Sequence, residues 1–461
     1  MYNYEILYEA YSKKISEKDR QCTTQLSKQW EKSKPFHGKK VLLNGHITLS
    51  TLIIIDILIR GGAKKVDVTA TENLVVHEYV LEIMKKAKIT FYSEGRIPKN
   101  KINNFYDMAF DCGAGLLKEI TPKKGMVELT QVDPKLYKNI NFPVITVDNS
   151  ETKKLETRYG TGDGLVRALI DMAKDSLKIY ITQLVDRFSK DKISMYEILC
   201  FNNIITNYGK LFHDRKYMLF GYGKVGLGIA LALSSAGVKK SDIYVIDVSK
   251  QACERASSCG YSVLYLSKNN SNSIKQIKKH LCNTYCVVTA TGVENAISDF
   301  FDKKDFDKVA HLVNMGTPDE FGYKFKKKDV LNNKKLFNFI LTYPTEVLYL
   351  DAIFTILLKA GKQLLEDKNL KNGIQNVSSN IDKNVSKFWN ELHNNTEWKH
   401  TEYSKIVSKE IKTYLRRVII TPGKQKKIIS SMISSRGFWK GHFAKIEKSI
   451  STKFEGQQII Y

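Results

Sequence analysis

Short apolar runs alternate with amphipathic segments along the first part of the chain. Residues 40–43 and 66–69 are rich in aliphatic and β-branched side chains and are short, which is typical of buried strands. Residues 52–58 and 79–85 carry apolar side chains at helical spacing. Because strands that alternate with helices form parallel sheets covered on both faces, we expect an α/β domain here.

The same alternation returns, more strongly, in the middle of the chain. Strands are predicted at residues 217–220, 243–246, 287–289 and 311–314, with helical segments between them. The sequence therefore predicts two Rossmann-like, doubly wound parallel-sheet domains.

A third region follows these two domains. We expect the first domain at residues 1–188, the second at 189–345 and the third region at 346–461. An apolar helix over residues 350–357 opens the third region, and from Lys368 onward the chain turns basic. This mostly helical, basic C-terminal region is the remaining part of the predicted architecture.

The bulk composition is that of a globular protein. The 461 residues are 43% hydrophobic and 26% charged, and a chain of this length needs more than one core. The longest apolar run, residues 49–59, is shorter than a bilayer span. Because the first residues lack a charged n-region followed by an apolar h-region, we do not expect export. Seven cysteines form neither a disulfide framework nor a zinc-ligand cluster. We expect a cytoplasmic protein with no metal site and no membrane partner.

The formal net charge of +25 admits two interpretations. Lysines that neutralise phosphates would indicate a polyanionic partner such as nucleic acid. Lysines that are simply solvated would indicate no such partner. We favour the second interpretation because the lysines are spread along the whole chain, and nucleic acid stays the alternative.

A glycine-rich loop follows the predicted strand at 217–220. Gly221, Gly223 and Gly226 have the G-x-G-x-x-G spacing, with Lys224 and Val225 between the last two glycines. Such a loop allows a tight turn, a close approach of pyrophosphate to the backbone, and close packing of helix on strand. Phosphates would lie at the N-terminus of the next helix, where free N–H groups favour negative charge.

An acidic residue ends the next strand, as a dinucleotide-binding domain requires. Asp247 can accept hydrogen bonds from the adenosine ribose, which favours NAD over NADP because a 2′-phosphate would meet a carboxylate. Thr289, Thr291 and Gly292 form a small-residue crossing where backbone is expected to approach the cofactor. The alternative is a Rossmann-like domain that has lost its nucleotide.

Several motifs, in order along residues 35–350, resemble those of S-adenosylhomocysteine hydrolases. The glycine loop 221–226 resembles the family's Gly-Tyr-Gly-Asp-Val-Gly, and residues 158–160 resemble the end of its Asn-Leu-Tyr-Gly segment. Residues 289–292 and 313–316, which include Asn314 and Gly316, resemble its Thr-Thr-Thr-Gly and Asn-Ile-Gly strands. Residues 44–48 resemble the His-Met-Thr segment of its substrate site.

The resemblance implies a chemistry and a set of site residues. In that family NAD oxidises a ribose hydroxyl, the ketone acidifies the neighbouring C–H, and a thiol is eliminated. The positions that match the family's polar site residues are His46, Asp111, Glu128 and Lys153, with Thr130 on the nicotinamide side. A carboxylate a few residues after the family's lysine corresponds loosely to Glu156.

Departures from the family pattern fall at its catalytic and adenine-reading positions. Thr317 and Tyr343 replace two histidines, and Ser50 stands where the family reads the adenine edge. Tyr343 is a candidate to take over acid–base work, since a phenol beside a cation can move a proton. A site without its adenine-reading groups loses orders of magnitude in specificity.

Three functions follow from these observations. The first is a divergent NAD-dependent enzyme that oxidises an alcohol carbon of a changed small-molecule substrate, transiently or as the net reaction. The second is an NAD-binding protein without catalysis, and the third is a true S-adenosylhomocysteine hydrolase with substituted site residues.

The basic tail is expected to make subunit contacts. The family's C-terminal arm reaches a neighbouring subunit, so the resemblance implies a homo-oligomer. Aromatic residues, which interfaces use at their centres, lie among the lysines at 388–389, Tyr403, Tyr414 and 438–439. The same mixture could track a nucleic-acid backbone, which is the alternative.

Overall fold

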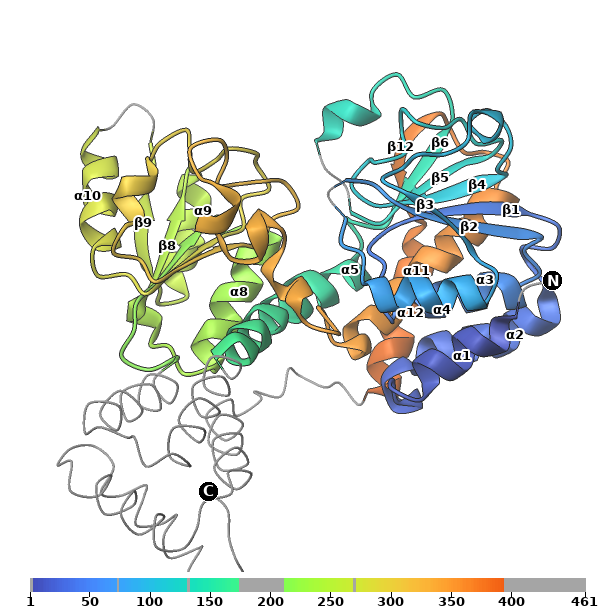
Figure 1. Ribbon diagram of the computed structural model, residues 1–461, viewed down its shortest axis with the longest axis horizontal. Coiled ribbons are helices and arrows are strands. Elements are labelled where there is room, and N and C mark those ends of the chain that lie inside the picture. Colours follow the sequence, from blue (N-terminus) through green and yellow to red (C-terminus); the bar gives the residue numbers. More distant parts are fainter. Residues whose placement is uncertain (1–2, 73, 131–132, 174–210, 268–270, 394–461) are drawn as a thin grey trace, which may run out of the picture. The chain divides into compact units, whose positions relative to one another are not determined.

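Two parallel β-sheets organise the chain (Figure 1). Both belong to one compact unit formed by residues 1–165, 216–232 and 243–399. The computed structural model describes residues 3–72, 74–130, 133–173, 211–267 and 271–393.

The first sheet has seven strands in the order β12-β6-β5-β4-β1-β2-β3, and every neighbouring pair is parallel. Its strands are β1 (Lys40–Asn44), β2 (Lys65–Ala70), β3 (Thr90–Ser93), β4 (Met108–Asp111), β5 (Gly125–Glu128), β6 (Pro143–Thr146) and β12 (Gly373–Asn376). The order reverses between β1 and β4, as in a doubly wound fold.

Helices cover both faces of the first sheet. Successive residues of β1 show why: Val41 and Leu43 enter one apolar core, and Leu42 enters a second core on the opposite face. The helices around this sheet are α1 (Tyr4–Ser12), α2 (Gln21–Ser33), α3 (Thr51–Arg60), α4 (Glu78–Lys86), α5 (Glu151–Leu155), α11 (Val347–Glu366) and α12 (Ser379–Leu392). Short turns complete it: η1 (Glu17–Arg20), η2 (Lys99–Lys101), η3 (Pro134–Tyr137) and the π-helical η4 (Glu156–Gly160).

The C-terminal region returns to the first sheet. Helix α11 packs against β4 and β5, and β12 pairs with β6 from Gly373↔Pro143 to Asn376↔Thr146. The sequence predicts α11, but it gave no signal for β12, because Gly373-Ile-Gln-Asn contains a single aliphatic residue. A return strand of this kind is held by its backbone ladder more than by its side chains.

The second sheet has five parallel strands in the order β11-β10-β7-β8-β9. Its strands are β7 (Tyr217–Phe220), β8 (Ile243–Asp247), β9 (Ser262–Tyr265), β10 (Cys286–Thr289) and β11 (His311–Asn314). Its helices are α8 (Lys224–Ser235), α9 (Lys250–Ser258) and α10 (Ser271–Leu281), with short turns η5 (Lys240–Asp242), η6 (Lys303–Phe306), η7 (Lys327–Asp329), η8 (Leu331–Lys334) and η9 (Phe337–Ile340). The predicted pair of doubly wound parallel sheets is confirmed.

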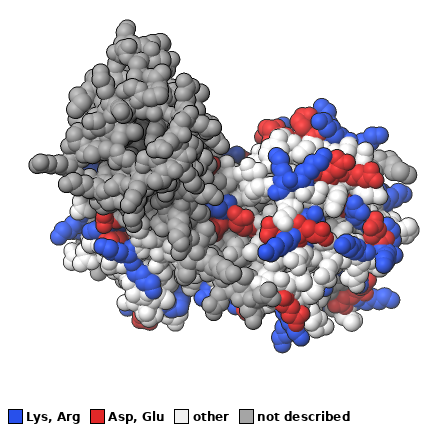
Figure 2. Space-filling view, turned by 90° about the horizontal axis from the view of Figure 1, so that it is seen from below, with Lys and Arg blue, Asp and Glu red and all other residues white. Residues whose placement is uncertain are grey.

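Positive and negative side chains are mixed over the described residues on one face of the molecule (Figure 2). On the face in Figure 2, Lys and Arg lie among Asp and Glu over the described residues. Opposite charges also form exposed ion pairs, such as Lys154–Glu151 (2.5 Å) and Lys303–Asp307 (2.9 Å). Within the part of the chain that the structure describes, no helix is both long and apolar enough to span a membrane.

Most of the predicted basic tail, residues 394–461, lies outside the described residues, with the aromatic positions expected there. Trp389, which we expected to anchor a subunit contact, is described and is buried within its own chain. Its ring contacts Tyr349, and its Nε1–H donates to the carbonyl of Leu348 at 2.8 Å. Trp389 therefore closes α12 onto α11.

Candidate active site

A cavity of about 410 Å³ lies at the carboxyl ends of strands from both sheets. Segments that follow β1, β4, β5 and β6 line it, together with the loops after β7, β10 and β11. In open α/β sheets, ligands bind outside the carboxyl ends of the strands, at the point where the strand order reverses. The cavity therefore occupies the expected place for a substrate and a cofactor to meet.

The glycine loop has the geometry that a dinucleotide requires. Gly221 has a φ of +92°, and a Cβ there would lie 2.4 Å from the Ala290 carbonyl oxygen. A Cβ on Gly226 would lie 2.0 Å from the Gly221 carbonyl oxygen. A Cβ on Gly223 would meet nothing within 4 Å. The first and third glycines are thus required by the fold, and the second leaves the backbone open to a ligand.

Asp247 ends β8 with its carboxylate held by the backbone. It accepts hydrogen bonds from the N–H groups of Tyr222 (2.7 Å) and Ser249 (2.8 Å), so it is oriented beside the glycine loop. The N-terminus of α8 begins at Lys224, where its free N–H groups favour a pyrophosphate. These residues fit a dinucleotide with an unphosphorylated ribose.

The loop after β10 is held by a buried acid that sequence analysis missed. Both carboxylate oxygens of Glu320 accept backbone hydrogen bonds, from Thr291 (2.9 Å) and Gly292 (2.6 Å). Thr291 and Gly292 line the cavity, and a Cβ on Gly292 would meet nothing within 4 Å. Glu320 follows Thr317-Pro-Asp in an irregular loop, where no pattern distinguishes it from a surface acid.

The remaining predicted cofactor residues divide into those that line the cavity and those that hold its walls. Gly316, Thr130, Val225 and Lys224 line it. The ammonium of Lys224 donates to Asp148 Oδ2 at 3.1 Å and to Asn149 Oδ1 at 3.2 Å.

Asn314 lies in a closed network behind the cavity. It accepts from Thr289 Oγ1 at 3.1 Å and donates to the Pro318 carbonyl at 2.9 Å and the Lys334 carbonyl. Asn314 and Thr289 therefore fix the loop after β11.

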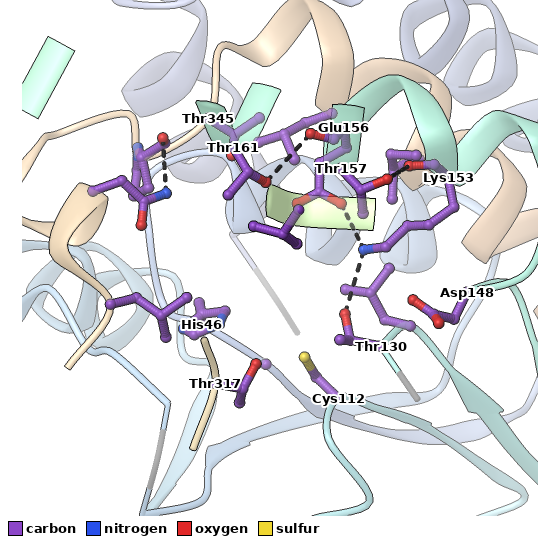
Figure 3. Close-up of a pocket in the computed structure, with 18 of the residues that line it drawn as sticks. His46, Cys112, Thr130, Asp148, Lys153, Glu156, Thr157, Thr161, Thr317 and Thr345 are labelled. Carbon is purple, nitrogen blue, oxygen red and sulfur yellow. Dashed lines mark hydrogen bonds and ion pairs between the residues drawn. The ribbon is translucent and has the colours of Figure 1, made fainter. Parts of the chain in front are cut away.

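Lys153 is the central cation of the cavity (Figure 3). Its side chain is 5% exposed, and its Nζ lies 2.7 Å from Glu156 Oε2 and 3.3 Å from Thr130 Oγ1. Burial lowers the pKa of Lys153, but the carboxylates of Glu156 and Asp148 outweigh it, so the pKa lies above its ordinary value. The ammonium therefore stays charged inside the cavity. Glu156 begins the π-helical turn η4, and such turns are frequent at functional sites.

His46 lies across the cavity from Lys153 (Figure 3). Its Nδ1 accepts a hydrogen bond from the Val75 N–H at 3.0 Å, and its ring packs on Phe339 with centroids 4.1 Å apart. Burial, assisted by the charge of Lys153, lowers the pKa of His46 to about 3. The imidazole is therefore neutral, with its proton on Nε2.

Asp111 and Glu128 are neighbours at the ends of β4 and β5. Asp111 accepts from the N–H groups of Cys112 and Leu116 and from the Asn44 amide at 2.7 Å. Burial and the nearby Asp111 raise the pKa of Glu128 to about 8, although several donors favour its charged form.

These two carboxylates shape the cavity in different ways. Asp111 lines the cavity, and Glu128 lies behind it. Glu128 accepts from the N–H groups of Gly113 (3.0 Å) and Thr130 (3.1 Å), so it holds the loops after β4 and β5 together. Cys112 also lines the cavity (Figure 3), and burial raises the pKa of its thiol to about 12.

Tyr343 does not lie with the other predicted catalytic residues at the cavity. It is absent from the described lining of the cavity, and its hydroxyl donates to the Lys14 carbonyl at 3.3 Å. The neighbouring Pro344 and Thr345 line the cavity instead. Thr317 and Ser50, which stand at the other departures from the family pattern, both line it.

Asp148, unlike Glu320, lines the cavity, and it is a second acid that sequence analysis missed. It follows β6, in the run Pro143-Val-Ile-Thr-Val-Asp148, as Asp111 ends β4. An acid after a short apolar run was a usable signal, because the carboxyl ends of parallel strands meet at one edge of the sheet.

The fold, the glycine loop and the oriented Asp247 define the second sheet as a Rossmann domain of the dehydrogenase kind, with NAD as its cofactor. The prediction of an NAD-binding domain is confirmed. The TrkA-N domain family matches residues 217–298, which run from β7 past β10 and contain the glycine loop and Asp247.

Two sequence relatives are similar to most of the chain. Adenosylhomocysteinase from Sulfurisphaera tokodaii is 24% identical over 407 residues, covering 79% of this chain and 86% of the relative. Adenosylhomocysteinase from Pyrococcus abyssi is 22% identical over 389 residues, covering 74% and 80%. Among solved structures, a transhydrogenase from Sinorhizobium meliloti aligns with 72% of this chain and 97% of its own, at 11% identity and a TM-score of 0.34.

Proposed function

We propose that the protein is an NAD-dependent enzyme that oxidises an alcohol carbon of a small substrate, either transiently or as the net reaction. The observation that carries this proposal is the charged Lys153 in the same cavity as the glycine loop. Bound NAD supplies the hydride acceptor. The two distant adenosylhomocysteinase relatives support an enzyme of this general kind.

Lys153 and Glu156 are the pair suited to an alcohol. The ammonium donates to the substrate oxygen and stabilises the negative charge that develops there. Glu156 lies 2.7 Å from Nζ and holds that ammonium in place, and its carboxylate offers the hydroxyl proton an acceptor. His46 is a poor base because its pKa is near 3, so it orients substrate through its Nε2–H.

Apolar side chains set the character of the rest of the substrate. Ile54 of α3 and Leu350, Ile353 and Leu357 of α11 line the cavity. The hydroxyl of Ser50 lies 2.9 Å from that of Thr48, so the position that matches the family's adenine reader is already paired. The proposed substrate joins an oxidisable carbinol to an apolar portion.

Absorbance of reduced nicotinamide tests the proposal. Purified protein is mixed with NAD and a panel of secondary alcohols, nucleosides and sugars, and the reduced-cofactor band is followed in single and multiple turnovers. Lys153→Met should abolish the band while leaving NAD affinity unchanged. Lys154→Met is the matched control, because that neighbouring lysine is exposed and pairs with Glu151. NAD binding with no reduced band for any substrate would instead favour a non-catalytic protein.

S-adenosylhomocysteine hydrolysis is the second candidate, favoured by the names of the two relatives. Thr317, Ser50 and the outward placement of Tyr343 argue against it, since the groups that match the family's chemistry are missing. We expect S-adenosylhomocysteine and adenosine to be poor substrates. Homocysteine release, followed with a thiol reagent, within about tenfold of a typical turnover of roughly ten per second would make hydrolysis the function.

A further inference from the structure

A second cavity, of about 280 Å³, lies among the N-terminal helices. Side chains from α1, η1, α2 and α3 line it, and none of them lines the first cavity. Among the described residues, its wall carries three cations, Arg20, Lys28 and Arg60, and one carboxylate, Glu31. The lining is therefore rich in positive charge.

Arg20 is the buried cation of this cavity. The residue is 4% exposed, and its guanidinium lies over the rings of Tyr8 and Tyr11, at 5.6 and 5.2 Å from their centroids. Its nitrogens donate to the Ile15 carbonyl (3.4 Å) and to Thr24 Oγ1 (3.0 Å). Because Tyr8, Tyr11 and Thr24 all line the cavity, the guanidinium forms part of its wall.

Among the described residues, no acid neutralises Arg20. It forms no ion pair with any residue that the structure describes, whereas Arg60 contacts Asp56 at 2.9 Å and Glu31 at 3.0 Å. The hydroxyl of Tyr11, which also lines the cavity, donates to Asp56 at 2.7 Å. A buried charge costs free energy unless it is paired. Asp56 and Glu31 thus already have partners, and the charge of Arg20 has no carboxylate to pair with among the described residues.

We propose that this cavity binds a small oxyanion, the phosphate or carboxylate group of a metabolite. A guanidinium presents its N–H groups as a fork that matches two oxygens of such a group. Thr24 and Ser27, one turn apart on α2, add hydroxyl donors on the same wall, and the exposed Lys28 ammonium lies at the rim beside Glu17 at 3.7 Å.

Helix α3 lies between an anion bound in the second cavity and the first cavity. Thr51 and Ile54 of α3 line the first cavity, and Ile53, Ile57 and Arg60 line the second. The two cavities therefore share α3 as a wall, although the anion site does not depend on the proposed reaction.

Calorimetry with inorganic phosphate, and separately with acetate, tests the site in the full-length protein at low ionic strength. Ser27→Asp places a carboxylate on the cavity wall, which should pair with Arg20 and weaken anion binding by about tenfold or more. Ser33→Asp adds the same charge to an exposed position of α2 outside the cavity and should leave affinity unchanged. Any phosphate binding at the glycine loop should have the same affinity in all variants. A difference in affinity between the variants therefore measures binding in the second cavity.

Arg20→Gln provides an independent variant, checked for its fold by circular dichroism. A loss of affinity in both Ser27→Asp and Arg20→Gln supports the site, and the tighter of the two anions identifies its chemical class. Equal affinity of Ser27→Asp, Ser33→Asp and the unchanged protein overturns the proposal, as does an absence of binding for both anions.

Discussion

Two backbone N–H groups hold the carboxylate of Asp247 in position. A substitution that tests its role in cofactor preference must therefore keep an acceptor for them. Replacement by alanine leaves both donors without an acceptor, whereas asparagine keeps one oxygen in place. We expect Asp247→Asn to lower the preference for NAD over NADP by about tenfold or more, because the repulsion of the 2′-phosphate is removed. Calorimetry with both cofactors measures the ratio. Glu254→Gln, an exposed acid on α9, is the control and should leave it unchanged.

His46 should make the stability of the protein depend on pH. Its pKa is near 3 in the folded protein and near 6.5 when unfolded, so the unfolded chain binds a proton more readily between these values. The stability from the neutral ring is fully present above pH 6.5 and is lost as the pH falls toward 3, on the order of 5 kcal/mol.

Urea unfolding at a series of pH values measures this contribution. His46→Gln should flatten the decline of stability between pH 6.5 and 3, and the exposed His37→Gln should leave the decline as it is. An identical decline in all three proteins would mean that His46 is protonated as easily in the fold as outside it.

Sequence patterns could predict the position of a site residue when the residues next to it in the chain determine that position. Gly221, Gly226 and Asp247 belong to one short strand–loop–helix–strand segment, and each lies where its local pattern placed it. Glu320 escaped notice because its role depends on Thr291 and Gly292, which are distant in the chain. Tyr343 is different, because a local match to the family suggested it as a site residue. In the structure its hydroxyl donates to the Lys14 carbonyl, and Tyr343 is not in the described lining of the cavity.

At the scale of elements, the helical segment from Glu156 to 173 crosses α8 at unusually close range. A Cβ on Gly228 would lie 2.4 Å from the Arg158 carbonyl oxygen, and one on Gly162 would lie 2.3 Å from the Gly228 carbonyl oxygen. Backbone therefore meets backbone, with no flexible side chain to yield. The crossing links η4, which carries Glu156, to the helix that begins at the glycine loop.

Gly228→Ala should therefore disturb both the fold and the site. We expect a loss of about 1–3 kcal/mol in the free energy of unfolding, despite the better helix propensity of alanine, because the added methyl overpacks the crossing. Urea unfolding measures the loss, and NAD affinity should fall with it. Ser234→Ala on the same helix is the control and should cost little. A stable Gly228→Ala protein would show that the two helices separate easily.

Strands and helices with regular patterns could be predicted from the sequence, and irregular ones could not. The alternation of buried strands with helices predicted β1 and β2 of the first sheet and β7, β8, β10 and β11 of the second, because parallel strands are apolar along most of their length. Strand β12 is polar and lies at an edge, and η4 is a deviation within a helical segment. Neither has a periodic pattern of its own.

At the scale of the whole molecule, the described part of the C-terminal region belongs to the fold. Helix α12 ends at Leu392, and Trp389 is buried against α11. A deletion after residue 380 would remove this packing and so would not test the tail alone. Deletion of residues 394–461 should dissociate the expected homo-oligomer and weaken NAD binding. Light scattering measures the assembly, and an unchanged mass would reject the tail as its interface.

A polyanion provides the other test of the tail. If the tail instead tracks nucleic acid, the full-length protein should bind a polyanion with an affinity that falls steeply with salt. The deletion should then abolish that affinity while the oligomer persists.

The pairing of β12 with β6 has a consequence for the order in which the protein is assembled during synthesis. The strands of the second sheet, from β7 to β11, leave the ribosome without interruption, so that sheet can form as soon as it is made. The first sheet begins earlier but must wait, with β6 as an open edge and β4 and β5 uncovered, until α11 and β12 emerge. The first sheet therefore stays incomplete, with apolar surface exposed, until after the second sheet has been made. Chaperones would bind the growing chain at this exposed surface of the first sheet.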